Sequence, residues 1–495
     1  MIEQTIDIPI DVPLLPYKAI RLGDLSCLYE AGNLRYIKCG DVELLRMIYA
    51  AVRDENWETI IPTIEDEKWS EHSGRISISY TALYVMGNIR YKGVFAIDIL
   101  HNSIVFTMKG TALSSFKKNR IGLCVLHPLP QCKGKTVEIT RPGGDIYQGV
   151  FPALISPHQP FKEIERMGWD AGENIKVQLA FFGNIFETED QRNWSDSSYK
   201  TYSTPLHLPF PALVMEGETM QQQVVVTITG NTGQQTQEIH SVKKLDKEIL
   251  LPKIGYCWPL NQSPLSNDKL IRIRENGIHH WRTELRLYET VWQDELLRTT
   301  EEASLLETKL ELILFFKNDY ETQLQLLLQD LKNIGQPVYS ILLLDSEHDV
   351  TPELLMRKGY DLIKAAHPLV KVGYGTDGFF AELNRNRPGD LPHDFVSFSV
   401  TPMAHASDAR TIIENLDSQP DIIETIKSFT DKEIHISPLT INVRRAVDTD
   451  PGKKLFSAPG DLIEDSEFGR AWISFAIQQF SEAGSITLLV SSKEL

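Results

Sequence analysis

The chain has 495 residues, of which 42% are hydrophobic and 24% are charged, the balance expected for ordinary globular domains. Lys and Arg total 50 against 67 Asp and Glu, giving a net charge of −17, which argues against nucleic acid as a partner. No run of about 18 apolar residues occurs, so no membrane span is predicted.

The N-terminal residues and the cysteines predict a cytoplasmic protein. Residues 1–13 are acidic and lack a basic segment followed by an apolar one, so no signal peptide is predicted. The five cysteines contain no CxxC pair and predict neither a disulfide scaffold nor a zinc site. We therefore expect reduced thiols, and neither a metal nor another cofactor is predicted. The cysteines are Cys27, Cys39, Cys124, Cys132 and Cys257.

The first half of the chain reads as many short strands separated by Gly, Asn and Lys turns, a pattern typical of an antiparallel β-sandwich. The segment 41–57 is ambiguous and fits either a helix or a hairpin of two strands. We expect an N-terminal β-sandwich domain over 1–245, ending in the polar stretch 231–250. The strand-like segments are 75–100, 102–110, 119–128, 135–151, 174–190 and 221–230.

The second half alternates apolar strands with helical segments of period 3.6. Eight such strands predict a (β/α)8 barrel of the TIM type over 246–495, although the chain stops five residues after the eighth strand, where a closing helix would follow. The predicted strands are 252–260, 277–287, 310–316, 338–345, 369–376, 395–402, 433–440 and 485–490. The predicted helices are 267–276, 294–309, 322–334, 352–368, 408–429 and 469–484.

Active sites of such barrels lie at the C-terminal ends of the strands, so the polar residues there are the first candidates. They are Arg282 and Glu284 in strand two, Asp345 to Asp349 after strand four, Asp377, Glu382 and Asn384 after strand five, His405 after strand six, and Asn442 and Arg444 after strand seven.

Each candidate also has a structural interpretation. Asp345 to Asp349 reads as a helix-capping turn, because ligands so close in sequence cannot all face inward to hold a metal. Asp377 could be a helix N-cap, and His405 could be a structural histidine. Arg282 and Glu284 lie on the same side of a strand and could form an ion pair.

Several reaction classes lack their motifs. Strand seven is followed by arginines rather than a carboxylate, which argues against a glycosidase that needs two carboxylates. Arginines suit a substrate carboxylate or a developing oxyanion instead. No GxSxG elbow, Walker A loop, HExxH motif or dinucleotide fingerprint occurs.

Two polar segments of the first half are candidate carbohydrate contacts. Residues 187–200 surround Trp194 and Tyr199 with charges of both signs and lack the periodicity of a buried strand, so we expect either a sugar platform or an ion-paired loop. Residues 156–161 could present His158 and Gln159 between two prolines, or could be a rigid packing loop.

At these residues the sequence resembles the D-apionate lactonase family of bacterial apiose breakdown. The resemblance covers both halves, and residues 186–202 (FETEDQRNWSDSSYKTY) are its strongest marker. It includes 34–57, 119–128 and 151–161 in the first half, and 375–388, 395–409 and 436–444 in the second. The resemblance implies an N-terminal β-domain, a central TIM barrel, a C-terminal domain and hydrolysis of the lactone of apionic acid.

Two departures from the family pattern stand at the end of the chain. Family members carry Tyr-Glu-Thr-Thr-Gly after strand eight, whereas this sequence reads LVSSKEL over 489–495, and the family's C-terminal domain does not follow. If the family's Glu is catalytic, this departure predicts a weak or inactive enzyme. Glu494 lies outside the motif and is not expected to replace it.

Hydrolysis of a sugar-acid lactone is therefore our leading hypothesis, with Asp377, Glu284 or His405 in acid–base roles and Arg444 at the oxyanion. The expected substrate contacts are Arg282, Glu382, Asn384, His158, Gln159, Glu189, Asp190, Arg192 and Asn193. The alternatives are a degenerate relative that binds a sugar acid or a partner without turnover, and a glycoside hydrolase with two barrel carboxylates about 5–10 Å apart.

Overall fold

The computed structural model describes residues 8–172, 174–230, 252–257, 265–275, 277–443, 463, 466–484 and 487–491. The chain divides by its contacts into two compact units. The N-terminal unit comprises Leu14–Arg192 and Ser197–Leu245, and the barrel unit comprises Met1–Pro13, Asn193–Asp196 and Asp246–Leu495. The polar stretch 231–250, where we expected the domain boundary, lies outside the described residues.

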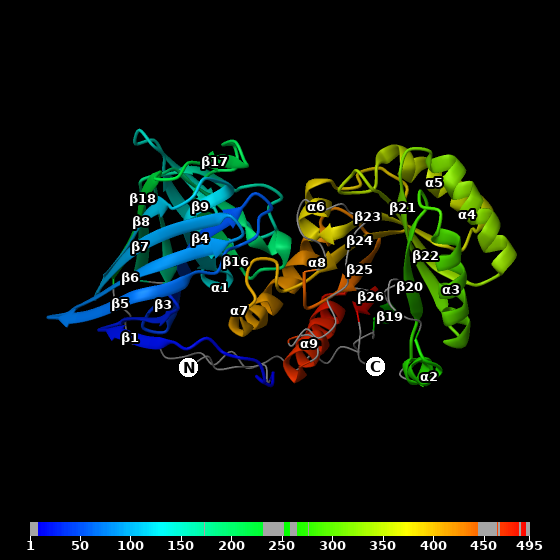
Figure 1. Ribbon diagram of the computed structural model, residues 1–495, viewed down its shortest axis with the longest axis horizontal. Helices are drawn as coiled ribbons and strands as arrows, with labels where there is room; N and C mark the ends of the chain where they lie inside the picture. The colour runs from blue at the N-terminus through cyan, green and yellow to red at the C-terminus, as the bar shows by residue number, and fades with distance from the viewer. Residues whose placement is uncertain are drawn as a thin grey trace. The chain divides into compact units, whose positions relative to one another are not determined.

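The N-terminal unit consists of two antiparallel sheets, drawn in blue to green in Figure 1. The first, sheet A, runs in the order β1-β2-β3-β4-β9-β16-β15-β12, with β17 paired to β9. Its strands are β1 (Lys18–Leu22), β2 (Leu25–Glu30), β3 (Asn33–Cys39), β4 (Val42–Asp54), β9 (Phe116–Pro128), β12 (Phe161–Ile164), β15 (Phe186–Asp190), β16 (Ser198–Tyr202) and β17 (Ala212–Val214).

The second sheet, sheet B, runs in the order β11-β10-β13-β14-β18-β8-β7-β6-β5. Its strands are β5 (Thr63–His72), β6 (Arg75–Met86), β7 (Ile89–Leu100), β8 (Ser103–Ala112), β10 (Thr136–Thr140), β11 (Ile146–Val150), β13 (Arg166–Gly172), β14 (Ile175–Phe182) and β18 (Thr219–Gly230). Buried and less buried residues alternate along β7, and one hydrophobic core contains residues of both sheets. The unit also has the short helices α1 (Leu129–Cys132) and η1 (Gln191–Trp194).

Two expectations for this half of the chain are wrong. Residues 41–57 form neither a helix nor a hairpin, because β4 is one 13-residue strand that pairs with β3 and β9. Residues 187–200 are not an irregular loop, because β15 and β16 pair with each other and every residue of both strands is buried. The polar composition hid β16, whose Lys200 is neutralised by Glu189 of β15, whereas β15 lies within the predicted strand segment 174–190.

The barrel unit contains eight parallel strands, and β26 pairs back with β19 so that the strands close into a ring. These are β19 (Lys253–Cys257), β20 (His280–Arg286), β21 (Lys309–Phe316), β22 (Val338–Asp345), β23 (Lys371–Phe379), β24 (Phe395–Val400), β25 (Glu433–Leu439) and β26 (Thr487–Ser491). All eight predicted strand segments therefore overlap observed strands.

The helical layer departs from a regular (β/α)8 barrel. Its helices are α2 (Asn267–Glu275), α3 (Trp292–Leu305), α4 (Tyr320–Ile334), α5 (Glu353–Ala366), α6 (Phe380–Arg385), α7 (Ala409–Glu414), η2 (Asn415–Ser418), α8 (Gln419–Lys427) and α9 (Glu467–Ala483). Helices α3, α4 and α5 cover one side of β20 to β22 (Figure 1). The six-residue α6 was not predicted, and the pairings of β19 with β20 and of β22 with β23 each extend over only three residues. Within the described residues, no helix is long and apolar enough to cross a bilayer.

Aromatic rings fill part of the barrel interior, and glycines make room for them. Phe395 and His435 stack with their ring centroids 3.8 Å apart. A Cβ atom on Gly373 would lie 2.2 Å from the Phe395 ring, and one on Gly255 would lie 2.0 Å from the His280 ring. Gly255 and Gly373 therefore allow the neighbouring rings to turn inward, which a larger residue would prevent.

Candidate active site

The described candidates after strands five and six lie at the same end of the barrel unit, because the strands are parallel. Asp377 lies near the end of β23, and His405 follows β24, the next strand in the ring. The Ser399 hydroxyl of β24 donates to the Gly378 carbonyl at 2.7 Å and so joins the two strand ends. Asp377 is 4% exposed, so its carboxylate is largely removed from water.

His405 has a carboxylate partner that the sequence did not single out. Its Nδ1 lies 2.5 Å from Oδ2 of Asp196, which belongs to the barrel unit by its contacts. Oδ1 of the same carboxylate accepts from Asn415 Nδ2 at 3.3 Å. With Nδ1–H donating to Asp196, the imidazole lone pair is on Nε2, the tautomer required of a general base.

The segment Asn193–Asp196, hereafter the inserted segment, contacts the residues that follow two barrel strands. Asn384 of α6 donates from Nδ2 to Oδ1 of Asn193 at 3.0 Å, and Arg387 Nη2 donates to Asn384 Oδ1 at 2.8 Å. The Trp194 ring lies 5.5 Å from the His405 ring, edge to face. The inserted segment thus links the loops after β23 and β24.

The cation of Arg385 also approaches the inserted segment, with its Cζ 5.2 Å from the centroid of the Trp194 ring. The Ser418 hydroxyl donates to the Ser195 carbonyl at 2.9 Å, which anchors the segment to η2. Ser195 has a φ of +70°, a conformation uncommon for residues other than glycine. This combination of partners fixes the carboxylate of Asp196 relative to His405.

Arg282 and Glu284 of β20 form an ion pair within the barrel, as one of the two interpretations predicted. Arg282 Nη1 lies 2.6 Å from Glu284 Oε1, and Arg282 Nε lies 3.9 Å from Oε2 of Glu311 on β21. Arg282 is 1% exposed, and burial lowers the pKa of its guanidinium. A buried arginine between two carboxylates remains in one position, which also restrains Glu284.

Glu311 is the centre of a buried polar cluster that the sequence analysis missed. Its carboxylate lies 3.6 Å from His280 Nε2 and 3.7 Å from His435 Nδ1, and it accepts from the Ser437 hydroxyl at 3.1 Å. Burial alone would raise the pKa of Glu311, but His280, His435 and Arg282 outweigh it and lower the pKa to about 2. Burial lowers the pKa of His280 to about 4. In the sequence, Glu311 is surrounded by the apolar residues of β21, so its place at the centre of a polar cluster could not be predicted.

Asp345 to Asp349 form a local turn after β22, but this turn does not cap the following helix as expected. Asp345 accepts from the backbone N–H of Glu347 at 2.8 Å and contacts His348 Nδ1 at 2.6 Å, while Tyr320 donates to it at 2.9 Å. Helix α5 begins after Pro352 without a side-chain cap, so Asp345 stabilises the turn rather than the helix. Among the described residues, no group of three or more His, Cys, Asp or Glu side chains is arranged to hold a metal ion.

The remaining candidates are distributed over both units. Asp190 and Arg192 form a buried pair at 2.7 Å in the N-terminal unit, where Arg192 also donates to the carbonyls of Pro152 and Ala153. Glu189 pairs with Lys200 across β15 and β16. His158 is exposed and Gln159 half-buried, in the loop before β12, and Glu382 lies in the first turn of α6. Arg444 lies outside the described residues.

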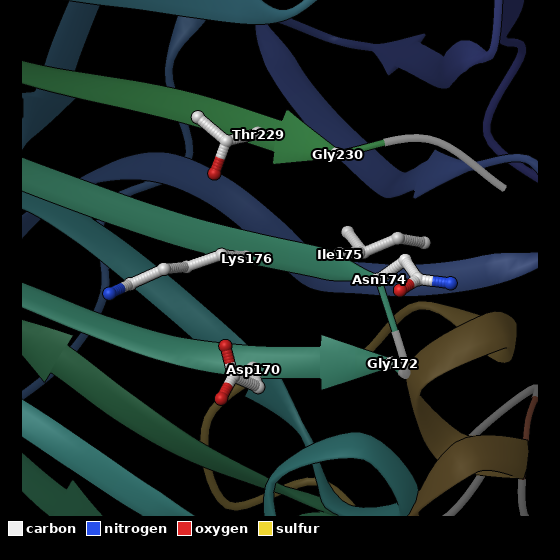
Figure 2. A pocket seen from close by; sticks show the side chains of 7 residues that line it. All are labelled: Asp170, Gly172, Asn174, Ile175, Lys176, Thr229 and Gly230. Atoms are coloured by element: carbon white, nitrogen blue, oxygen red, sulfur yellow. The ribbon is translucent and has the colours of Figure 1, made fainter.

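The N-terminal unit has a pocket that none of the predicted site residues lines. It lies where β13 and β18 end and β14 begins, and Asp170 of β13 is opposite Lys176 of β14 in the strand register (Figure 2). The other lining residues are Gly172, Asn174, Ile175, Thr229 and Gly230. Its lining offers one exposed acidic side chain, one exposed basic side chain and few further functional groups, so it does not resemble a catalytic centre.

Comparison with known proteins gives the family. The model of the N-terminal domain of D-apionate lactonase matches residues 9–231, and that of its TIM barrel domain matches residues 254–493. The D-apionate lactonase of Brucella anthropi is 27% identical over 511 residues, covering 96% of this chain and 82% of the relative.

Solved structures are less similar. A putative aldose 1-epimerase of Escherichia coli K12 is 10% identical with a TM-score of 0.31, covering 44% of this chain and 99% of that one. A GH36 alpha-galactosidase of Geobacillus stearothermophilus is 12% identical with a TM-score of 0.30, covering 97% and 84%. These TM-scores do not establish a common fold. The two domain models and the Brucella anthropi relative agree over nearly the whole sequence, and the chain belongs to the D-apionate lactonase family.

Proposed function

We propose that this protein hydrolyses the lactone of a sugar acid, such as apionolactone, to the open acid. The observation that carries the proposal is the contact between His405 and Asp196 at the C-terminal end of the barrel strands, in a chain of the D-apionate lactonase family. Lactone hydrolysis needs a base that activates water, a group that stabilises the oxyanion and a proton donor for the leaving alkoxide.

In this mechanism His405 is the general base. Its Nε2 removes a proton from water while the oxygen of that water attacks the carbonyl carbon of the ring. Asp196 holds Nδ1–H and stabilises the imidazolium that forms, as a carboxylate does for histidine in hydrolytic triads. The C–O bond of the ring then breaks, and the alkoxide takes up a proton.

The other proposed roles belong to groups on or just after other strands of the barrel. Asp377 is the candidate donor of the proton to the alkoxide, since it lies near the end of the strand next to that of His405. Glu284, restrained by Arg282, and Asn384, held by Asn193, are proposed to bind substrate hydroxyl groups. Arg444 remains proposed for the oxyanion.

The test is proton release from a panel of aldonolactones, followed with a pH indicator, with and without a chelator. The proposal is supported if the parent protein hydrolyses a lactone faster than the spontaneous reaction and if the variants His405→Ala and Asp377→Asn lose this activity. Saturable binding of the lactones by a folded protein without turnover would instead favour the degenerate binding relative. Loss of activity on chelation would add a metal that the proposal does not include.

A further inference from the structure

The N-terminal unit carries a second cluster of buried charges, on the face of sheet A that points away from the shared core. Strand residues alternate between faces, and on this second face Ala51, Cys124 and Tyr202 form an apolar cluster separate from the main core. Arg53 of β4 and Arg120 of β9 lie on this same face, directly opposite each other in the strand register. They are 9% and 5% exposed.

Arg120 is held in place, but two of its three guanidinium nitrogens have no hydrogen-bond partner. Its Cζ lies 5.1 Å from the Trp57 ring centroid and 4.9 Å from that of Phe210, and these rings pack against each other. Its Nη1 donates to the Asn119 carbonyl at 2.6 Å. Its Nε and Nη2 are buried without any hydrogen-bond partner. This edge of a guanidinium can form two parallel hydrogen bonds with a carboxylate.

An unsatisfied buried guanidinium is costly, so its retention needs a reason. Other buried arginines of sheet A have carboxylate partners: Arg35 binds Glu30, and Arg46 binds Glu43. Within the described residues, neither Arg53 nor Arg120 forms an ion pair. The carboxylates that influence Arg120 electrostatically, Glu187 and Glu189, are already engaged.

The engaged groups lie on the same face and suit hydroxyl groups. Glu187 accepts from the Tyr202 hydroxyl and the Leu206 N–H, each at 2.6 Å, and Glu189 pairs with Lys200. Three cations and two carboxylates therefore leave this cluster one positive charge in excess. A small ligand that offers one carboxylate and several hydroxyl groups matches this charge and these partners.

We propose that Arg120 and Arg53 bind the carboxylate of a small polyhydroxy acid, with Glu187, Glu189 and Tyr202 facing its hydroxyl groups. This sugar-acid site is formed by residues of the N-terminal unit. It fits the chemical class of an open aldonate rather than that of an uncharged sugar or lactone.

Calorimetric titration of the full chain with D-gluconate, acetate and D-glucose tests the proposal. We expect gluconate to bind more tightly than acetate, and glucose not to bind. Arg120→Gln should weaken gluconate binding by about 10- to 100-fold, because it removes a pair of charge-assisted hydrogen bonds. Arg46→Gln is the matched control, since it removes a buried arginine of the same sheet that already has a partner.

Three results would overturn the proposal. These are the absence of gluconate binding to the parent protein, equal binding of acetate and gluconate, and gluconate binding that survives Arg120→Gln but is lost in the barrel variant Glu284→Gln. A ligand-free measurement adds a further check. Arg120→Met should keep or raise the melting temperature, whereas Arg46→Met should lower it. A large loss for Arg120→Met would show that the cation serves the fold and not a ligand.

Discussion

His405 Nδ1 lies 2.5 Å from Asp196 Oδ2, although 209 positions separate the two residues in the sequence. The carboxylate is buried, and Asn415 holds its other oxygen. Such a partner fixes both the tautomer and the orientation of an imidazole. The proposed base is therefore assembled from two distant parts of the chain.

The first prediction concerns this contact. Asp196→Asn should lower kcat of lactone hydrolysis by about 100-fold or more with little change in KM, because the amide favours the wrong imidazole tautomer. Initial rates of proton release measure this effect. Asp408→Asn is the control, since Asp408 caps α7 through the Thr411 N–H and should affect stability alone. An Asp196→Asn variant as active as the parent would remove His405 from the role of base.

The second prediction concerns the buried pair Asp190 and Arg192. Asp190→Asn should reduce the free energy of unfolding by about 3–5 kcal/mol, because it leaves the guanidinium buried without its counterion. Urea denaturation measures the change. The exposed pair of Arg141 and Glu163 is the control, and Arg141→Ala should change stability by less than about 1 kcal/mol. Equal effects of the two variants would contradict this account.

The third prediction concerns acid stability. Burial lowers the pKa of His127 to about 3, so the folded protein keeps this ring neutral while the unfolded chain protonates it near pH 6.5. The contribution of the neutral His127 ring to the free energy of unfolding is complete above pH 6.5. It is lost as the pH falls toward 3, by about 1.4 kcal/mol per pH unit. His127→Gln should be less stable at pH 7 but lose less stability between pH 6 and 4.

Urea denaturation at several pH values tests the role of His127. The exposed His101 provides the control, because His101→Gln should leave the pH dependence of stability unchanged. If the slope for His127→Gln equals that of the parent, another group governs acid unfolding. His280 of the barrel, with a pKa near 4, is the next candidate.

The fourth prediction concerns the barrel interior. Gly373→Ala should reduce the free energy of unfolding by about 1–3 kcal/mol, since the added Cβ would lie 2.2 Å from the Phe395 ring. Gly168→Ala is the control in β13, because its Cβ would meet its nearest neighbours at an ordinary 3.4 Å. Thermal unfolding followed by circular dichroism compares the two. A Gly373→Ala protein as stable as the parent would mean that the ring has room to move.

The sequence allowed the strands of the barrel to be predicted because each is a short apolar run between helices of clear period. It failed at β16, where Lys200 and its neighbours resemble a solvated loop, although the strand-like segment 174–190 includes β15. Hydrophobic periodicity cannot reveal strands whose buried charges are paired with one another. The same limit concealed Glu311, whose histidine partners lie on β20 and β25.

Prediction of the site was likewise limited by distance along the chain. Asp377 and His405 were chosen as candidates because strand ends indicate where barrel chemistry lies. Asp196 lies within the polar segment 187–200, but nothing in the spacing connects it to a histidine so far away. Only the fold shows that the residues flanking Asn193–Asp196 belong to one unit and the segment itself to the other.

The inserted segment also limits how the gene can be divided. A gene fragment starting at codon 246 would encode all eight barrel strands but not Asp196. In its product, His405 would lack the carboxylate that orients it. Recombination that exchanges the barrel alone between relatives would break the same contact. The two halves of the coding sequence are therefore expected to be inherited together, although the polar stretch 231–250 looks in the sequence like a place to divide them.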